Sequence, residues 1–324
     1  MCSTSTRRKI SGFRKIKKRK KRLKRPPLKR IRTLFFGTSA FAVPSLRVMA
    51  RRTDLAGAVT QPDSRSGRGR QMHASPVKSA AVALGVPVYQ PASLRAFANE
   101  LQGTYDLFAL ASYGKILPQA LLDVPAFGAL NVHPSLLPRY RGATPIQSAL
   151  LDDARETGVT IMLMDAGLDT GDIVLQEATP VEPQERYGEL HDRLAQLGSQ
   201  LLERALGAAQ DGALPRHPQQ GEGSLTHPFG KSDLILDWNW PVRRVVSAVR
   251  AFSPTPAARA QLRGEAVKLL RAQPFAGERF DAPPGSIVSA HGEAATVQCG
   301  DGAVDVLELV PANRRAMSGA AFLR

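Results

Sequence analysis

The chain has few cysteines, no acidic residues near its amino end and no long apolar run. Cys2 and Cys299 are the only cysteines among 324 residues, which excludes a disulfide-stapled framework and is typical of a reducing cytosol. No apolar stretch approaches the roughly 20 residues that a membrane-spanning helix needs, so a transmembrane segment is not expected. The length suffices for two domains, each with its own core.

The positive charge of the chain is concentrated at its amino end. Residues 1–32 hold 16 of the 44 Lys and Arg residues and no Asp or Glu. The other 28 basic residues equal the 28 acidic ones, so this segment supplies the formal net charge of +16. We expect residues 1–30 to be a disordered basic extension, either an artefact of an upstream start codon or an arm that attracts phosphates without sequence choice. A secretory signal is not expected, because Gly37 interrupts the apolar run, and the lysine blocks suit a transit peptide poorly.

From residue 31 onward, the apolar pattern alternates between strands and helices. Strands are expected at 31–36, 55–60, 86–89, 105–111, 130–133, 159–164 and 172–176, and helices at 41–51, 76–84, 93–101, from 144 onward and at 185–209. Residues 61–75, rich in Gly, Arg and Ser, are typical of a loop. This alternation predicts an α/β fold with a doubly wound, mainly parallel sheet, whose ligands bind beyond the carboxyl ends of the strands.

A change of composition predicts a second domain. Residues 211–231 have the Gly, Pro and Gln content of a linker. After them, a helix at 242–252 precedes short strands at 257–262, 266–270, 286–289, 295–299 and 304–310. Such strands predict a small antiparallel barrel. We therefore divide the chain into an extension at 1–30, an α/β domain at 31–210, a linker at 211–231 and a barrel domain at 232–324.

An amide and an imidazole lie at the carboxyl end of one expected strand, and a carboxylate follows the next. Asn131 and His133 lie two residues apart before Pro134, so their side chains project from one side of the strand, roughly 6–7 Å apart. Asp169 lies in a glycine-bracketed loop after strand 159–164. Taken alone, Asn131 and His133 could be a hydrogen-bonded turn, and Asp169 a loop acid that caps a backbone N–H. Together, without a Ser or Cys nucleophile, they indicate acyl transfer to an amine with no covalent enzyme intermediate.

Several separated motifs carry a family resemblance. They are Phe36-Gly37-Thr38, Thr60-Gln61-Pro62-Asp63, Gly67-Arg68-Gly69-Arg70, Ser75-Pro76-Val77-Lys78, Ser112-Tyr113-Gly114-Lys115-Ile116-Leu117-Pro118, the dense block 131–147, and Leu168-Asp169-Thr170-Gly171-Asp172. In these motifs and their order, from about residue 31 almost to the end, the chain resembles the methionyl-tRNA formyltransferase family. It departs from the family in its basic extension, in the lack of Trp between Pro254 and Pro256, and in an end that falls short of the usual last turn.

The resemblance implies a formyltransferase-type Rossmann domain followed by an OB-like, tRNA-binding barrel. It implies formyl transfer from 10-formyltetrahydrofolate, a co-substrate, to the free amine of initiator methionyl-tRNA for translation initiation, in the bacterial cytoplasm or, as second choice, an organelle. By matching position, the catalytic residues are Asn131, His133 and Asp169. The residues expected to bind the folate are Ser135, Leu136, Leu137, Pro138, Tyr113 and Gly114. Those expected to bind tRNA are Arg65, Arg68, Arg70 and Lys78.

The residues suggest a division of labour within the catalytic site. We expect the Asn131 amide to hold the oxyanion of the tetrahedral carbon. Protonated His133 would help it and then assist departure of the folate nitrogen, while Asp169 orients the imidazole. On composition alone, residues 135–138 could instead be a plain apolar loop, and the arginines a solvated surface loop.

Three other functions stay open at this point. One is a related folate-dependent formyltransferase acting on glycinamide ribonucleotide or an amino sugar, against which the second domain and the loop 61–78 argue. Another is a hydrolase with water as acceptor. The third is a non-catalytic nucleic-acid-binding protein, against which the intact Asn131, His133 and Asp169 argue. We expect no metal, because the histidines lack ligand spacing, and a monomer.

Overall fold

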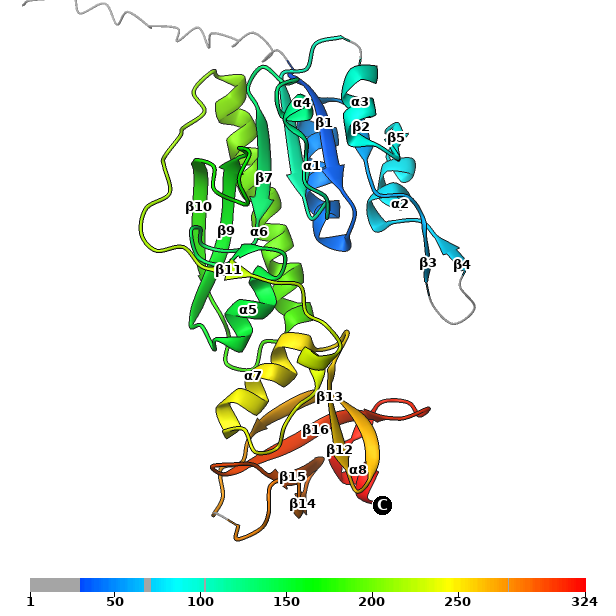
Figure 1. Cartoon of the computed structure of the whole chain (residues 1–324), viewed down its shortest axis with the longest axis vertical. Coiled ribbons are helices and arrows are strands. Elements are labelled where there is room, and N and C mark those ends of the chain that lie inside the picture. The colour runs from blue at the N-terminus through cyan, green and yellow to red at the C-terminus, as the bar shows by residue number, and fades with distance from the viewer. Residues whose placement is uncertain (1–29, 67–70, 102, 279) are drawn as a thin grey trace, which may run out of the picture.

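The computed structural model describes residues 30–66, 71–101, 103–278 and 280–324. Figure 1 shows two lobes stacked along the long axis, with an α/β lobe above and a β lobe below. The predicted basic extension lies outside the described residues apart from Arg30. Among the helices in the described ranges, none combines the length and apolar character needed to cross a membrane.

A seven-stranded sheet forms the centre of the upper lobe, in the order β10-β9-β7-β6-β1-β2-β5. The strands from β5 to β7 run parallel, whereas β9 is antiparallel to β7 and β10 is antiparallel to β9. This confirms the predicted mainly parallel sheet. The strands are β1 (Arg32–Gly37), β2 (Asp54–Val59), β5 (Val88–Tyr89), β6 (Leu107–Ala111), β7 (Ala129–His133), β9 (Glu156–Leu163) and β10 (Ile173–Pro180).

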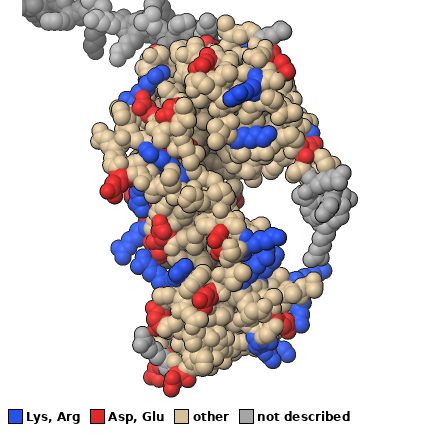
Figure 2. Space-filling view, viewed as in Figure 1, with Lys and Arg blue, Asp and Glu red and all other residues tan. Residues whose placement is uncertain are grey.

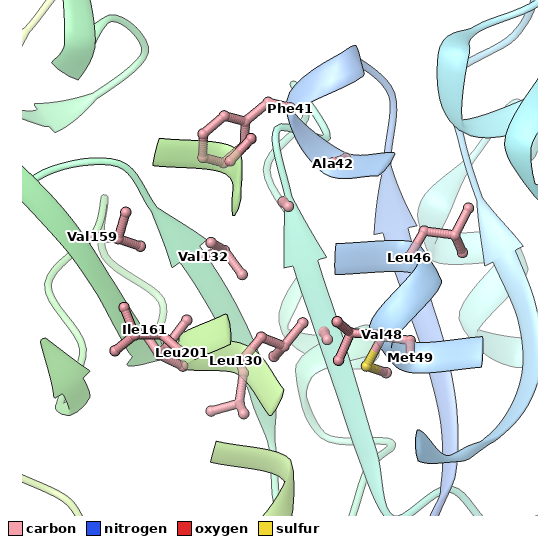
Figure 3. Packing of buried hydrophobic residues seen from close by; sticks show 14 of the residues in the cluster. Phe41, Ala42, Leu46, Val48, Met49, Leu130, Val132, Val159, Ile161 and Leu201 are labelled. Carbon is pink, nitrogen blue, oxygen red and sulfur yellow. The ribbon is translucent and has the colours of Figure 1, made fainter. Parts of the chain in front are cut away.

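Helices cover both faces of this sheet, which explains why its central strands are almost continuously apolar. One cluster joins Phe35 to side chains of α1, α2, α5 and α6, while Leu34 and Phe36 face a second cluster with α3 and α4. Figure 3 shows Leu130 and Val132 of β7 between the β9 side chains and those of α1. The helices are η1 (Ala40–Ala42), α1 (Val43–Arg52), α2 (Pro76–Ala83), α3 (Leu94–Glu100), α4 (Gln119–Leu122), α5 (Pro145–Leu151) and α6 (Tyr187–Gln210).

Several elements of the upper lobe differ from the sequence expectation; helix α4 was not expected, and β9 begins at Glu156 rather than residue 159. The segment expected as a loop at 61–75 contains a hairpin of β3 (Ser64–Ser66) and β4 (Gln71–His73). Its short polar strands have no apolar alternation, so the pattern gives no strand signal. Strand β10 reaches Pro180 rather than residue 176, because its exposed residues are polar while its backbone continues to pair with β9.

The lower lobe is an antiparallel sheet in the order β12-β13-β16-β15-β14, with β17 paired to β16. It packs around its own core, which includes Trp238, Val249 and Phe252. The predicted antiparallel character is confirmed, and the ladder has two ends, at β12 and β14, as in a partly open barrel. The elements are η2 (Ser232–Leu234), α7 (Val242–Phe252), β12 (Ala258–Leu262), β13 (Glu265–Pro274), β14 (Ile287–His291), β15 (Ala294–Gln298), β16 (Ala303–Pro311), β17 (Met317–Ser318) and α8 (Gly319–Leu323).

Buried Arg250 of α7 ties the lobes together. Its guanidinium donates to the backbone carbonyls of Glu185 and Glu182 at 3.0 and 3.1 Å and lies 3.2 Å from a carboxylate oxygen of Asp153. Because this cation is only 6% exposed and has three acceptors in the upper lobe, it fixes the position of α7. The predicted linker is also not a free connector, since its strand β11 (Leu225–Thr226) pairs with β8 (Arg141–Gly142) of the upper lobe.

Candidate active site

The structure brings Asn131, His133 and Asp169 together at one end of β7. The Asn131 Nδ2 lies 3.5 Å from one carboxylate oxygen of Asp169, and the His133 Nδ1 lies 3.6 Å from the other. Alternate β7 residues Leu130 and Val132 pack in the cluster with α1, so Asn131 and His133 project to the opposite face. All three polar side chains line a cavity of about 490 Å³. The arrangement places an amide donor, a proton acceptor and a carboxylate at one cavity wall.

The surroundings of His133 fix its tautomer. Its Nε2 lies 3.0 Å from the backbone carbonyl oxygen of Tyr140. A carbonyl oxygen can only accept, so Nε2 carries a proton and the Nδ1 of the neutral ring faces Asp169 with a free lone pair. The ring nitrogen that can take up a proton is therefore the one that faces Asp169.

Burial sets the charge of His133. Its side chain is 4% exposed, and this desolvation lowers the pKa of His133 below its ordinary value of 6.5, although the Asp169 carboxylate opposes the shift. Near neutral pH the resting imidazole is therefore uncharged. Burial disfavours the charged form more than the neighbouring carboxylate favours it. The protonated His133 of the sequence hypothesis would therefore have to gain its proton during the reaction.

Asp169 is held in an unusual backbone conformation. Its φ of 52° lies in the left-handed region, which residues with a side chain seldom adopt. The backbone N–H of Gly142 donates to its Oδ2 at 2.8 Å. Two residues on, Gly171 passes so close to β9 that an added Cβ would lie 1.8 Å from the carbonyl oxygen of Leu163. Close packing of this loop thus directs the carboxylate towards His133.

Tyr113 and Gly114, two of the residues expected to bind the folate, line the cavity. The carbonyl oxygen of Tyr113 accepts hydrogen bonds from the Thr38 hydroxyl at 2.9 Å and from the Gln61 amide at 2.8 Å. Gly114 has a φ of 80°, which suits glycine. Burial raises the pKa of the Tyr113 phenol to about 12, so its hydroxyl is neutral at physiological pH. The motifs that contain Thr38, Gln61 and Tyr113 therefore meet beside the cavity.

Ser135, Leu136, Leu137 and Pro138 directly follow Pro134, which lines the cavity, but are not themselves among its lining residues. The Ser135 hydroxyl donates to the Arg139 carbonyl at 2.6 Å, and the Leu137 N–H donates to the Thr160 hydroxyl at 3.2 Å. These bonds hold a tight turn against β9. The expected contact between these four residues and the folate stays a prediction.

The residues expected to bind tRNA fall into two groups. Arg68 and Arg70 lie outside the described residues, and Arg65 belongs to β3. Lys78 is already paired, with its Nζ 2.6 Å from a carboxylate oxygen of Asp63 and 3.0 Å from the Gln90 side chain. This network anchors the base of the β3–β4 hairpin, so Lys78 has a structural partner that the sequence motif did not reveal.

Tertiary packing adds cavity residues that sequence reasoning missed. Phe41 of η1 and Tyr187 and His191 of α6 line the cavity, and the His191 ring lies 5.5 Å from that of Phe41. These residues come from distant segments without a motif. Asp165 could have been found, because it directly follows a predicted strand; its carboxylate accepts from the Thr170 hydroxyl at 2.8 Å. Among the residues that the structure describes, no group of three or more His, Cys, Asp or Glu side chains is arranged to hold a metal.

Comparison with known proteins relates both lobes to one family. Residues 29–206 match the formyl transferase family and residues 229–324 match the formyl transferase C-terminal domain. The methionyl-tRNA formyltransferase of Xylella fastidiosa strain M12 is 43% identical over 298 residues, covering 90% of this chain and 97% of that protein. The methionyl-tRNA formyltransferase of Syntrophus aciditrophicus is also 43% identical, over 302 residues, covering 91% of this chain and 96% of that protein.

Solved structures share the fold at lower identity. HypX from Aquifex aeolicus in complex with tetrahydrofolic acid has a TM-score of 0.62 at 20% identity, covering 91% of this chain and 47% of that chain. An N-formyltransferase from Helicobacter canadensis in complex with folinic acid and dTDP-3-aminofucose has a TM-score of 0.62 at 18% identity, covering 85% and 98%. Since both family models match in order and the relatives align over nine-tenths of its length, the chain belongs to the formyl transferase family, among the methionyl-tRNA formyltransferases.

Proposed function

We propose that the protein transfers a formyl group from 10-formyltetrahydrofolate to the free amine of initiator methionyl-tRNA. The convergence of Asn131, His133 and Asp169 at one cavity wall carries this proposal. The product, N-formylmethionyl-tRNA, would serve translation initiation. Because the relatives with this activity in their names are bacterial, we place the reaction in bacterial cytoplasm, with an organelle as second choice.

The cavity suits a folate co-substrate. Its volume of about 490 Å³ is within the usual range for small-molecule sites. Two apolar lining side chains stay open to solvent, Ile116 at 84% and Leu168 at 52% exposure, and they could cover a flat ring. We propose that residues 113–117 and 164–169 hold the folate, which supplies the formyl group on a nitrogen atom. From the family resemblance, we propose that residues 135–138 also contact the folate.

Each polar group at the wall has a role in the proposed transfer. Among the described residues, the Asn131 Nδ2 makes one long contact, to Asp169, so it can donate to the oxyanion that develops when the amine attacks the formyl carbon. His133 takes the proton of the attacking amine on its free Nδ1 and returns it to the departing folate nitrogen. The Asp169 carboxylate stabilises the imidazolium between these two steps.

The acid side of the pH–rate profile should report His133. Since burial lowers the pKa of His133 below 6.5, we expect kcat/KM to rise with pH along an acid limb whose midpoint lies below pH 6.5. Below the pKa the ring is protonated and cannot accept the amine's proton. Formylation rates would be measured from pH 4.5 to 8 with folate in excess, after correction for protonation of the acceptor amine. An acid limb centred above 6.5 would contradict the neutral resting state.

We propose that the hairpin and the lower lobe bind the tRNA. Figure 2 shows Lys and Arg side chains gathered near the narrow region between the lobes and along the lower lobe. In the lower lobe, the side chains of Arg243 and Arg314 are 74% and 56% exposed, and each lies within 4 Å of a carboxylate, that of Asp153 and that of Glu265. In the corresponding domain division, residues 31–210 are catalytic, 211–231 connect, and 232–324 bind tRNA. The monomeric state stays a prediction.

Neutralising the hairpin arginines should weaken tRNA binding without slowing the chemistry. For the triple change of Arg65, Arg68 and Arg70 to Gln, we expect a higher KM for tRNA and a kcat close to wild type. The dependence of log KM on log salt should flatten by about one unit for each tRNA phosphate that an arginine no longer neutralises. Replacing exposed Arg95 and Arg216 with Gln is the matched control. A lower kcat at saturating tRNA would argue against a role in binding alone.

Acceptor competition tests the proposed function. The protein is incubated with 10-formyltetrahydrofolate and, separately, charged initiator tRNA, glycinamide ribonucleotide, a nucleotide-linked amino sugar or buffer alone. We expect rapid formylation of methionyl-tRNA only. Formylation of the ribonucleotide or the sugar alone would replace the tRNA assignment, and formate release without an amine would indicate a hydrolase.

A further inference from the structure

Gln219 lies in the predicted linker yet hydrogen-bonds to the loop that carries Asp169. Its Nε2 donates to the backbone carbonyl oxygens of Asp169 and Gly171, both at 2.8 Å. Its Oε1 accepts from the Nη2 and Nε of Arg141, at 2.7 and 3.1 Å. Both N–H groups and the oxygen of the amide are therefore engaged, and only one orientation of the amide satisfies all four bonds.

The loop around Asp169 depends on support of this kind. With a φ of 52°, Asp169 adopts a conformation that residues with a side chain disfavour, so contacts outside the loop must hold it there. Gly142 supplies one such contact, because its N–H donates to the carboxylate. Gln219 supplies two more, to the main-chain carbonyls on either side of Thr170. Together they fix both ends of the short segment that aims the carboxylate.

The linker itself is fastened on two sides of this loop. We call residues 217–226 the linker strap. At one end, the backbone of His217 exchanges two hydrogen bonds with Ile173, at 2.8 and 2.9 Å. At the other end, Thr226 pairs with Gly142, where an added Cβ would lie 2.7 Å from the Thr226 carbonyl oxygen. The linker strap thus holds Gln219 beside the loop that carries Asp169 and Gly171.

We propose that Gln219 is a positioning residue for formyl transfer, which fixes the carbonyls of Asp169 and Gly171 so that the Asp169 carboxylate stays beside His133. Gln219 is not among the residues that line the cavity, so it acts through Asp169 rather than on a substrate. This inference rests on the proposed catalytic role of Asp169. It assigns to the linker a part in the chemistry in addition to joining the lobes.

Two substitutions separate this role from simple packing. Gln219→Glu has the same shape and can still pair with Arg141, but a carboxylate cannot donate to the two carbonyls. Gln219→Met is neutral and can form neither set of hydrogen bonds. The neighbouring exposed Gln220, replaced in the same two ways, is the matched control. Thermal unfolding and binding of 5-formyltetrahydrofolate show that each variant is folded.

We expect both Gln219 variants to lose about 10- to 100-fold in kcat, with KM for tRNA and folate within about twofold, because a displaced catalytic group slows the chemical step. In Gln219→Met, the acid limb of the pH profile should also move to lower pH, because a displaced Asp169 no longer favours the protonated His133. The Gln220 variants should match the wild type in both measurements.

Several outcomes would overturn the inference. A wild-type kcat in Gln219→Glu with a low kcat in Gln219→Met would assign the effect to Arg141 instead. Lower thermal stability with normal kcat would indicate packing alone, and a higher KM with normal kcat would indicate a binding role. If Gln219→Met does not fold, Gln219→Glu decides alone. If the proposed function is wrong, the unaltered protein fails to formylate methionyl-tRNA. The kcat of the Gln219 variants is then compared with that of the unaltered protein on the acceptor that the unaltered protein does formylate.

Discussion

Replacing His133 with alanine lowers kcat for methionyl-tRNA formylation by about 100- to 10,000-fold, which corresponds to about 2.7–5.4 kcal/mol of activation free energy. The reason is that the buried imidazole presents an unprotonated Nδ1 beside the Asp169 carboxylate, and alanine has no atom that could take up the proton there. Binding of the folate should change little. The measurement is single-turnover formylation at saturating folate and tRNA, with folate affinity determined separately.

The matched control for this change is His227→Ala. The His227 side chain is exposed, and its structural contact is made by the backbone carbonyl, which accepts from the Thr144 hydroxyl at 2.8 Å and survives the substitution. This control should retain wild-type kcat. Near-normal turnover in the His133 variant, at a saturated folate site, would remove His133 from the mechanism.

Replacing Asn131 with alanine should lower kcat by about 100- to 1,000-fold through loss of the oxyanion donor. The pH–rate profile distinguishes this change from the one at His133. Because the proton acceptor is retained, the acid limb should remain in Asn131→Ala although the rate is lower throughout. Replacing the exposed Asn99 of α3 with alanine is the control and should have no effect.

A second change at the same position sharpens the test. Asn131→Asp keeps the shape of the side chain but places a carboxylate within about 3.5 Å of Asp169 and removes the donor. The new carboxylate should repel both Asp169 and the developing oxyanion, so kcat should be lower than in the alanine variant. An Asn131→Ala variant with normal kcat and a raised KM would mean that Asn131 binds the substrate equally in the ground and transition states.

Much of the fold could be predicted because burial leaves a local pattern. The alternation of apolar strands with helices defined the upper sheet, and short strands between turns indicated the antiparallel lower lobe. The hairpin β3–β4 was missed, since its strands Ser64–Ser66 and Gln71–His73 are each three residues long. That is shorter than the roughly 4–8 residues over which alternation indicates a strand.

The sequence by itself determined the family, the sheet and the three polar groups at its edge. Asn131 and His133 share a strand, whose period of two puts them on one side, and Asp169 lies in a motif at the next strand. Tertiary structure decided the neutral state of His133, because desolvation depends on packing from every side. It also decided the placement of Asp169, through Gln219, which lies 50 residues away along the chain. Every residue has the same backbone carbonyl group, so the sequence does not show which side-chain amide donates to it. Only the folded chain does.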